Sequence, residues 1–281
     1  MRIRDCLKDA RARLEAAGVP DAAVDAGWLL AGVLRKSRLE TLAMGDEPLS
    51  EEQRAAFEAL LVRRLQREPL QYILGETEFM GRRFLARPGA LIARNDTELL
   101  AGLALQYLPR GGRALDLCTG SGALAVTLAL SAPGATVDAA DVSEEALALA
   151  RDNVRLHGAN VNFLLGNLFA PCAGRRYAMI CCNPPYIRRG ELAGLQREVR
   201  FEPALALDGG EDGLDFYRRI ALGAPAHLIP GGWLLLEFGE GQAEAIERLL
   251  APCFDEIRVY HDMAGLPRAM QARRKEAHAL A

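Results

Sequence analysis

Four consecutive residues, Asn183-Pro184-Pro185-Tyr186, have the types needed to hold a planar –NH2 group. They directly follow residues 177–182 (Tyr-Ala-Met-Ile-Cys-Cys), an apolar run typical of a buried strand in a parallel sheet. Neither proline can donate a hydrogen bond to a sheet, so the chain must leave it at Asn183, where open α/β sheets bind ligands. There the carboxamide and the proline carbonyls would accept the amino hydrogens, and Tyr186 would stack on the group's face. We expect all four residues to be catalytic; the alternative is a proline-rich turn with no chemical role.

A glycine-rich segment upstream predicts a cofactor-binding turn between a strand and a helix. It reads Asp116-Leu117-Cys118-Thr119-Gly120-Ser121-Gly122, and we expect every residue in it except Leu117 to bind the cofactor. Gly120 and Gly122 permit a tight turn and let a ligand approach the backbone without meeting a Cβ atom. With Ala125 the segment also fits the dinucleotide pattern G-x-G-x-x-A, so the glycines alone leave NAD open.

Two features favour S-adenosylmethionine over NAD. Asp116 lies in the strand before the glycines, where it can face the ammonium of a methionine moiety but would repel a pyrophosphate. Asn183 follows the fourth strand, where an acceptor amine would meet a methyl donor, so we expect it to contact the cofactor as well. The alternative for Asp116 is a helix-capping carboxylate.

Two further positions follow the neighbouring strands. Asp141 ends the next strand, where it can accept hydrogen bonds from the ribose hydroxyls of either cofactor. Asn167 and Leu168 follow the third strand, where the edge of an adenine should lie. For Asn167, an ordinary turn residue is the alternative.

The elements that position these residues follow from hydrophobic periodicity. The periodicity of residues 1–75 predicts only helices, over 3–14, over 22–34 and over 50 to about 66. The third begins at Ser50, which can form a capping box with Gln53. Short β-type runs at 72–74, 78–80 and 83–86, separated by glycines, predict a hairpin-like linker.

From residue 99 onward, predicted helices and strands alternate. The helices cover 99–108, 122–130, 143–157, 215–228 and 242–250; the strands cover 114–117, 136–140, 161–165, 177–182, 233–238, 256–260 and 268–272. This alternation predicts a doubly wound, mostly parallel sheet. We therefore expect an α/β fold, a Rossmann-like S-adenosylmethionine-dependent methyltransferase sheet, preceded by a small N-terminal helical bundle.

The composition is that of an ordinary globular protein, with 281 residues, half of them hydrophobic and a quarter charged. A net charge of −3 gives no global attraction for nucleic acid or an anionic membrane. The first residues are charged where a signal peptide needs an apolar stretch, so we expect a cytoplasmic protein. The cysteines form no C-x2-C pair, so we expect neither a metal site nor a disulfide framework; they are Cys6, Cys118, Cys172, Cys181, Cys182 and Cys253.

The order Asp-x-x-x-Gly-x-Gly, then Asn-Pro-Pro-Tyr, resembles the amino-methyltransferases that act on exocyclic or amide nitrogens. Longer motifs over nearly the whole chain resemble the release factor glutamine methyltransferase family (PrmC/HemK). These are Glu68-Pro-Leu-Gln-Tyr-Ile-Leu-Gly75, Glu78-Phe-x-Gly81, Arg200-Phe-Glu-Pro203, Asp212-Gly-Leu-Asp-Phe-Tyr-Arg-Arg-Ile220, Pro230-Gly-Gly and Asp262-Met-Ala-Gly265-x-x-Arg268.

The resemblance implies that different parts of the chain have different functions. Residues 1–75 would recognise the substrate protein, residues 76–95 would form a hairpin linker, and residues 96–281 would form the methyltransferase domain. The implied reaction is N5-methylation of the glutamine in the Gly-Gly-Gln loop of class I peptide chain release factors, with S-adenosyl-L-homocysteine as the second product.

The chain departs from the family pattern at two places. Residues 92–98 read Ile-Ala-Arg-Asn-Asp-Thr-Glu, where the family usually has Ile-Pro-Arg-Pro-(Glu/Asp)-Thr-Glu, so the linker lacks two rigid prolines. Asn167 stands where an acid is common; it can still accept from the adenine amino group if its own –NH2 turns away.

Other functions stay open at this point. Residues 116–122 also resemble the glutamine methyltransferases of ribosomal protein L3, and adenine-N6 or cytosine-N4 methylation of nucleic acid would use the same acceptor residues. A cofactor-binding interaction module without catalysis is a third class, against which the intact acceptor set argues. We expect a monomer with no direct nucleic acid or membrane partner.

Overall fold

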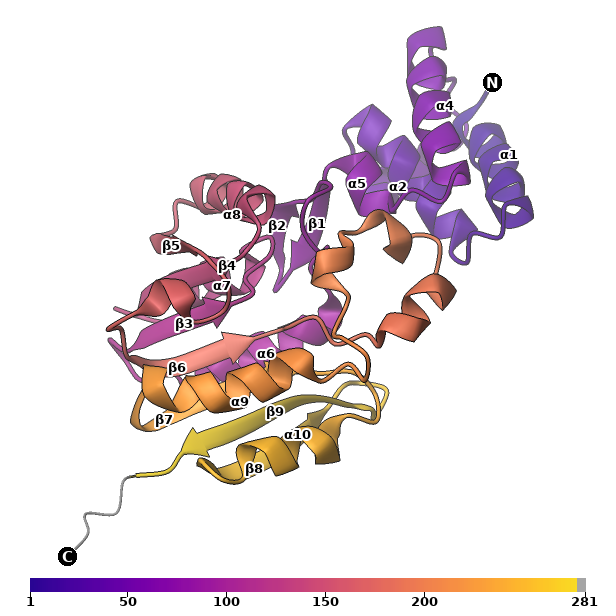
Figure 1. The fold of residues 1–281 in the computed structure, drawn as a ribbon. Coiled ribbons are helices and arrows are strands. Elements are labelled where there is room, and N and C mark those ends of the chain that lie inside the picture. Colours follow the sequence, from indigo (N-terminus) through magenta and orange to yellow (C-terminus); the bar gives the residue numbers. More distant parts are fainter. Residues whose placement is uncertain (277–281) are drawn as a thin grey trace, which may run out of the picture. The chain divides into compact units, whose positions relative to one another are not determined.

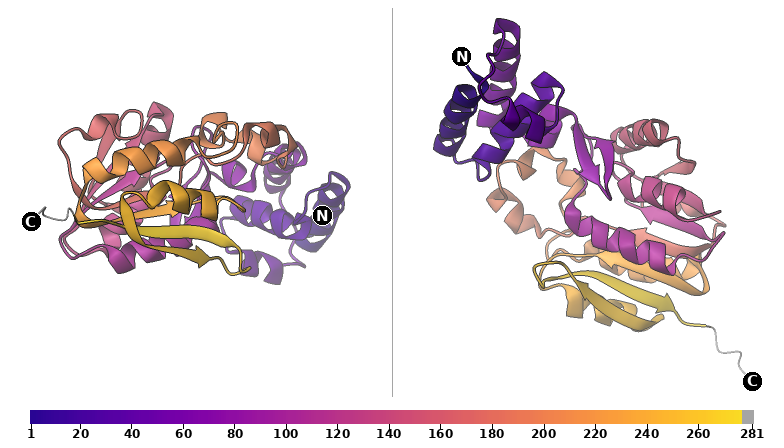
Figure 2. Two further views of the ribbon diagram at one scale, coloured as in Figure 1. Left: turned by 60° about the horizontal axis from the view of Figure 1, so that its bottom comes forward. Right: turned by 180° about the vertical axis from the view of Figure 1, so that it is seen from behind.

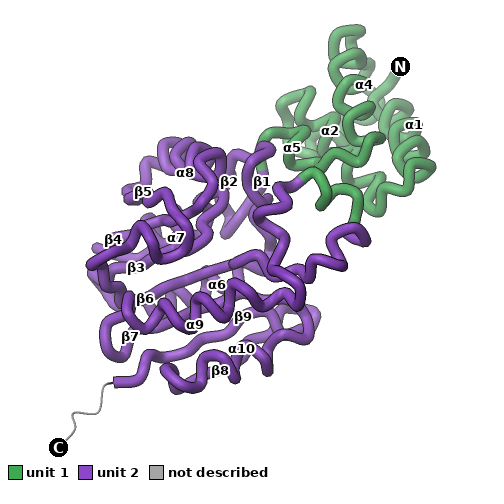
Figure 3. Tube along the Cα trace, in the orientation of Figure 1, with its two compact units in different colours: residues 1–76, 196–201 green, residues 77–195, 202–281 purple. Residues whose placement is uncertain are grey.

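The computed structural model describes residues 1–276, which form two compact units (Figure 3). Unit 1 comprises Met1–Glu76 and the short segment Gln196–Phe201; unit 2 comprises Thr77–Leu195 and the chain from Glu202 onward. The chain therefore passes between the units three times. The sequence analysis contained no signal that residues 196–201 return to the N-terminal unit.

Unit 1 is built from five helices: α1 (Ile3–Ala16), α2 (Ala22–Leu34), α3 (Arg38–Ala43), α4 (Glu51–Leu65) and α5 (Leu70–Leu74). Their apolar faces enclose one core that includes Leu14, Leu29 and Phe57. The expected capping box of Ser50 and Gln53 starts α4. A second capping box, of Ser37 and Glu40, starts the short helix α3, which the periodicity analysis missed.

One local prediction in unit 1 is wrong. Residues 72–74, expected as a β-type run, lie in α5, which Pro69 precedes and Gly75 ends with a left-handed φ of 78°. A five-residue helix is too short to display the 3.6-residue repeat, so a run of apolar residues in it cannot be told from a strand. The packing of Tyr72 and Ile73 against unit 1 decides the conformation.

Unit 2 begins with a two-stranded hairpin, β1 (Glu76–Phe79) and β2 (Arg82–Leu85). These strands correspond to the β-type runs predicted at 78–80 and 83–86. Helix α6 (Asn95–Tyr107) follows and leads into a seven-stranded sheet (Figure 1). Its strands are β3 (Arg113–Leu117), β4 (Thr136–Asp141), β5 (Val161–Leu165), β6 (Tyr177–Cys182), β7 (Leu228–Glu237), β8 (Phe254–His261) and β9 (Pro267–Arg274).

The strand order is β5-β4-β3-β6-β7-β9-β8; β5 to β7 are parallel, and β9 is antiparallel to both of its neighbours, β7 and β8. The connecting helices are α7 (Ala123–Ser131), α8 (Glu144–His157), α9 (Asp215–His227) and α10 (Ala243–Leu250). Short 3-10 helices cover Ala170–Cys172, Arg189–Gly194, Val199–Phe201 and Ala204–Ala206, the third of them in unit 1. The predicted α/β fold with a mostly parallel sheet is confirmed.

Both faces of the sheet are buried in unit 2. Helices α9 and α10 cover the face toward the viewer in Figure 1, and α6 covers the opposite face, seen from behind in Figure 2. Successive residues of one strand serve the two cores in turn: Ile180 packs with the α9 and α10 side, and Met179 and Cys181 with the α6 and α7 side. This explains why residues 177–182 are continuously apolar rather than alternating.

Within residues 1–276, no helix combines the length and the apolar character needed to cross a bilayer.

Candidate active site

The ends of β3 and β6 bring the two predicted motifs together. The strands are parallel neighbours with Leu117 opposite Cys182, so Cys118 and Asn183, the next residue of each chain segment, leave the sheet at the same edge. The chain runs from β3 to β4 and β5 on one side, then crosses to β6 and β7 on the other. This is the topological switch point, at which open α/β sheets bind ligands.

A cavity lies at this edge, within unit 2, with an empty volume of about 1040 Å³ that includes its open mouth. Of the predicted residues, Gly122, Pro184 and Tyr186 lie outside its lining. The predicted residues that line it are Asp116, Cys118, Thr119, Gly120, Ser121, Asp141, Asn167, Leu168, Asn183 and Pro185. The structure therefore gathers most of the glycine-rich segment and half of the acceptor motif around one space.

The two glycines of the turn have different roles. Gly120 has a left-handed φ of 55°, and a Cβ atom added there would meet nothing within 4 Å, so its backbone faces open space. Gly122, with a φ of 77°, begins α7, and a Cβ atom there would lie 2.8 Å from the Cβ atom of Ala150 on α8. The expectation that both glycines make room for a ligand therefore fits Gly120, whereas Gly122 permits close packing of two helices.

Asp116 is buried, with an exposed fraction of 2%, and its Oδ2 accepts from the Thr119 hydroxyl at 2.6 Å and the Ala125 amide at 3.1 Å. The bond to Ala125 supports the start of α7, as the capping alternative expected. Burial raises the pKa of Asp116 to about 7, although these two hydrogen bonds oppose the rise. Both bonds use Oδ2, which leaves Oδ1 for a ligand.

Asp141 joins three parts of the site. Its Oδ2 accepts from the Gly120 amide and its Oδ1 from the Ser143 amide, both at 2.9 Å. Burial raises the pKa of this carboxyl group, and the backbone hydrogen bonds oppose that rise. Asp141 thus fixes the glycine turn against the start of α8 while lining the cavity.

Asn167 differs from its expected arrangement. Its side chain is exposed, and its Oδ1 accepts a hydrogen bond of 2.6 Å from Arg219 of α9. The oxygen that was expected to receive the adenine amino group thus already has a basic partner, which the sequence analysis did not single out. Leu168 beside it is buried, with a φ of 48°.

The loop after β6 is fixed by a close backbone approach at one glycine and by several hydrogen bonds. A Cβ atom on Gly209 would lie 2.7 Å from the backbone of Tyr186, so only glycine permits this approach. Gln242 donates to the Tyr186 carbonyl at 2.9 Å, and Ile187 exchanges backbone hydrogen bonds with Leu207 and Gly209. Burial raises the pKa of Tyr186 to about 12. Residues 183–187 are therefore fixed in place by their surroundings in unit 2.

Glu202 joins two walls of the cavity. It accepts from the Ile92 amide at 2.8 Å and forms an ion pair with Arg94, and both of these residues line the cavity. Pro203, next to Glu202, lines the cavity as well. The only signal for Glu202 in the sequence was its place in the motif Arg-Phe-Glu-Pro.

The two carboxylates that line the cavity, Asp116 and Asp141, fit S-adenosylmethionine as the ligand. The groups that act on Asp116 are Thr119, the Ala125 amide and the Asp141 carboxylate, none of them cationic. A buried acid in this setting gains from a positively charged ligand. Asp141 adds oxygens beside the open backbone at Gly120, as a ribose requires, and a pyrophosphate would be repelled by both carboxylates.

Sequence comparisons relate this chain to known methyltransferases. Residues 5–75 match the family described as the PrmC N-terminal domain, and residues 93–199 match the methyltransferase small domain. A release factor glutamine methyltransferase of Deinococcus radiodurans is 42% identical over 276 residues, covering 98% of this chain and 99% of that protein. One of Geobacter sulfurreducens is 46% identical over 245 residues, covering 87% of this chain and 86% of that protein.

The chain belongs to the release factor glutamine methyltransferase family. The enzyme class expected from the sequence is thereby confirmed: the protein is a protein glutamine methyltransferase.

Solved structures agree on the fold alone. A methyltransferase of Pyrococcus furiosus has a TM-score of 0.54 at 17% identity, covering 78% of this chain and 98% of that one. A 16S rRNA methyltransferase of T. thermophilus, solved with AdoMet and guanosine, has a TM-score of 0.54 at 20% identity, covering 71% of this chain and 50% of that one.

Proposed function

We propose that this protein uses S-adenosylmethionine to methylate N5 of the glutamine in the Gly-Gly-Gln loop of class I peptide chain release factors. The observation that carries the proposal is the pairing of β3 with β6, which sets Asn183 beside the glycine turn at one cavity. The names of the relatives support a release factor as the substrate.

The acceptor residues address the main chemical difficulty. An amide nitrogen is a poor nucleophile because its lone pair is delocalised into the carbonyl group. In the proposed complex, Asn183 Oδ1 and the Pro184 carbonyl each accept one amide hydrogen, which fixes the nitrogen and stabilises the positive charge that develops on it. Pro185 and Tyr186 pack against the amide and exclude water.

The cofactor residues complete the assignment. Bound S-adenosylmethionine supplies a methyl group on a positively charged sulfur. Asp116 would face its ammonium group, Asp141 its ribose, and Asn167 and Leu168 its adenine, with the backbone at Gly120 open toward it. The glutamine nitrogen gains a carbon–nitrogen bond as the carbon–sulfur bond breaks, and the methylated amide loses its proton to water. S-adenosyl-L-homocysteine is the second product.

The division of labour along the chain is part of the proposal. Residues 1–75 would recognise the release factor, the hairpin region 76–95 would link the parts, and residues 96–281 would carry out the transfer. Because release factors act on ribosomes, the protein would work in the cytoplasm, as a monomer without direct contact to nucleic acid.

The test is incubation of the purified protein with S-adenosylmethionine and a class I release factor, followed by mass spectrometry of the Gly-Gly-Gln peptide. We expect that peptide to gain one methyl group, and a release factor with glutamate in place of that glutamine to gain none. Asn183→Ala should abolish transfer while cofactor binding stays measurable by calorimetry, and Asn160→Ala, an exposed asparagine outside the site, serves as the matched control.

Two outcomes would contradict the proposal. Near-wild-type transfer by Asn183→Ala would remove the acceptor role of this residue. Methylation of ribosomal protein L3 or of DNA, with the release factor unmodified, would replace the assigned substrate.

A further inference from the structure

A buried carboxyl group lies behind the acceptor residue. Glu237 is the last residue of β7, one position beyond Leu236, which pairs with Cys182 of β6. Glu237 is therefore the neighbour of Asn183 across the sheet. Its exposed fraction is 2%, and its Oε2 has no hydrogen-bond partner among the described residues. A buried acid of this kind is costly to the fold, which points to a role in function.

Three side chains form one hydrogen-bonded set. Asn183 Nδ2 donates to Thr97 Oγ1 at 3.2 Å. Both side chains also act on the carboxyl group of Glu237, whose pKa they lower as hydrogen-bond donors do. All three residues belong to unit 2, and Thr97 and Asn183 line the cavity.

The rules of donors and acceptors leave this set one arrangement. An ionised carboxylate can only accept hydrogen bonds, so Thr97 must donate its single O–H to Glu237. Its oxygen can then only accept from Asn183. One hydrogen of Asn183 Nδ2 goes to Thr97, and we assign the other to the neighbouring carboxylate of Glu237. The amino half of the Asn183 carboxamide is thus held by the protein, and only its oxygen is left for a substrate.

We propose that Glu237, acting with Thr97, is a positioning residue that locks the carboxamide of Asn183 with Oδ1 presented to the acceptor amide. This inference rests on the proposed function for the identity of the acceptor. Without the lock, the carboxamide can turn over and present its –NH2, which would repel the substrate –NH2 rather than accept from it.

The protonation state of Glu237 controls the lock. Burial raises its pKa to about 7, hydrogen bonds from Thr97 and Asn183 oppose this, and the charges of Asp96 on α6 and Arg268 on β9 act in opposite directions. Tyr186 and Tyr217 also face it. Once protonated, Glu237 can donate as well as accept, so the arrangement of the three side chains is no longer fixed. Methyl transfer should therefore require the ionised form and fall as the pH decreases through about 7.

The central variant is Glu237→Gln, which keeps the shape but presents an –NH2 as well as an oxygen at every pH. We expect kcat to fall on the order of a hundredfold, as small misplacements of reacting groups do. The KM for the release factor and the Kd for S-adenosylmethionine should change little. The fall of kcat between about pH 8 and pH 6 should weaken, although Asp116 titrates in the same range.

A matched pair at position 97 separates hydrogen bonding from packing. Thr97→Ser keeps the hydroxyl and should retain most of kcat, whereas Thr97→Val keeps the shape, removes the hydroxyl and should lose it. Equal kcat values for these two variants, or a wild-type kcat and pH profile for Glu237→Gln, would overturn the inference.

A measurement without substrate keeps this test apart from the proposed function. In protein labelled with 15N-asparagine, the side-chain –NH2 signals of Asn183, assigned by Asn183→Ala, should titrate near pH 7 in the wild type and not in Glu237→Gln. If these signals do not change with pH in the wild type, the positioning role of Glu237 is refuted even where the release factor is methylated. If they titrate and the release factor stays unmodified, the lock stands and the substrate assignment fails.

Discussion

Asp116 shows how one side chain can both stabilise the local fold and serve a ligand. Its Oδ2 accepts from Thr119 and from the start of α7, which leaves Oδ1 for a ligand in the cavity that Asp116 lines. Its pKa of about 7 is raised by burial, and a cationic ligand would favour the ionised form. The binding and capping interpretations of this residue are therefore compatible.

At the scale of single residues, we predict that Asp116 makes cofactor binding depend on pH. Below about pH 7 its carboxyl group becomes neutral and no longer attracts an ammonium group, so the affinity for S-adenosylmethionine should fall as the pH decreases. Asp116→Asn should weaken binding by roughly tenfold, about 1.4 kcal/mol, and remove most of the pH dependence. Calorimetry on both proteins at about pH 6 and pH 8 measures this, with thermal unfolding as the control for folding. Equal wild-type affinity at both pH values would contradict the role.

At the scale of elements, the packing of α7 against α8 depends on the absence of one side chain. Gly122 faces Ala150 of α8 at a distance that excludes a Cβ atom, whereas Gly120 two residues earlier faces open space. The turn thus has one glycine for helix packing and one beside the cavity, and a sequence pattern cannot tell them apart.

These two glycines give a matched pair of variants. Gly122→Ala should destabilise the protein by about 1–3 kcal/mol, because it adds a clash to an unfavourable left-handed conformation. Gly120→Ala meets no atom within 4 Å, so it should cost less stability but weaken cofactor binding more. Denaturant unfolding and calorimetry on both variants test this, and a reversed order of the two effects would contradict the assignment.

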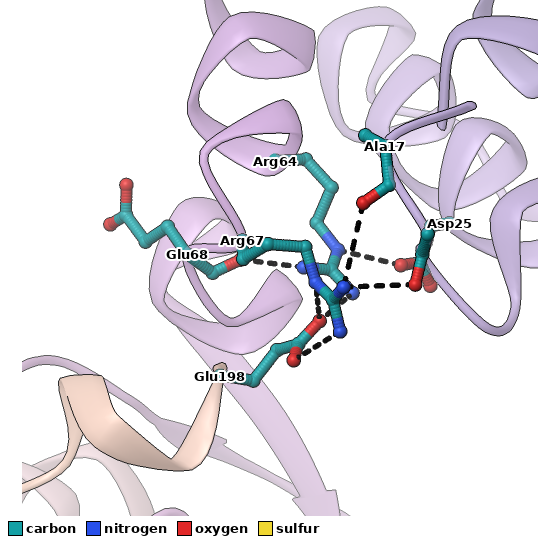
Figure 4. Close-up of polar contacts among 7 residues, drawn as sticks. Ala17, Asp25, Arg64, Arg67, Glu68 and Glu198 are labelled. Atoms are coloured by element: carbon teal, nitrogen blue, oxygen red, sulfur yellow. Dashed lines mark hydrogen bonds and ion pairs between the residues drawn. The ribbon is translucent and has the colours of Figure 1, made fainter. Parts of the chain in front are cut away.

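At the scale of the whole molecule, an ion-pair network holds a distant segment of the chain in unit 1 (Figure 4). The carboxylate of Glu198 accepts two hydrogen bonds from Arg67, at 2.6 and 2.7 Å, and one from Arg64, at 2.9 Å. Arg64 also donates to Asp25 at 2.7 Å. Burial opposes ionisation of Glu198, but the hydrogen bonds from Arg67 and Arg64 lower its pKa to about 2. The charge of Glu198 therefore stabilises unit 1 at neutral pH, and this contribution is lost as the pH falls from about 4 toward 2.

We predict that Glu198→Ala loosens the segment 196–201. Without this carboxylate, Arg64 and Arg67 stay largely buried, and among residues 1–276 Arg64 keeps only Asp25 as an ionic partner. Trypsin should then cut after Arg197 or Arg200 faster than in the wild type, and thermal unfolding should begin at a lower temperature. Glu191→Ala, an exposed acid outside unit 1, is the control. Unchanged cleavage in Glu198→Ala would show that the segment is held by other contacts.

Local sequence patterns were enough to predict the fold class, the enzyme class and the motifs at the strand ends. Proline and glycine restrict the backbone locally, and strand–helix alternation is a local pattern, so residues 177–186 and 116–122 could be recognised without coordinates. The short helices α3 and α5 were missed or misassigned because a few residues carry too little periodicity.

The groups that surround these motifs could be identified only in the folded chain. Thr97, Glu237 and Arg219 lie far from the motifs in the sequence and reach them through strand pairing and helix packing. Nothing local marks Glu237 as buried beside Asn183, or Glu198 as a partner of unit 1. Burial and hydrogen-bond partners depend on the whole chain, and for this reason the orientation of the Asn183 carboxamide could be argued only from the folded molecule.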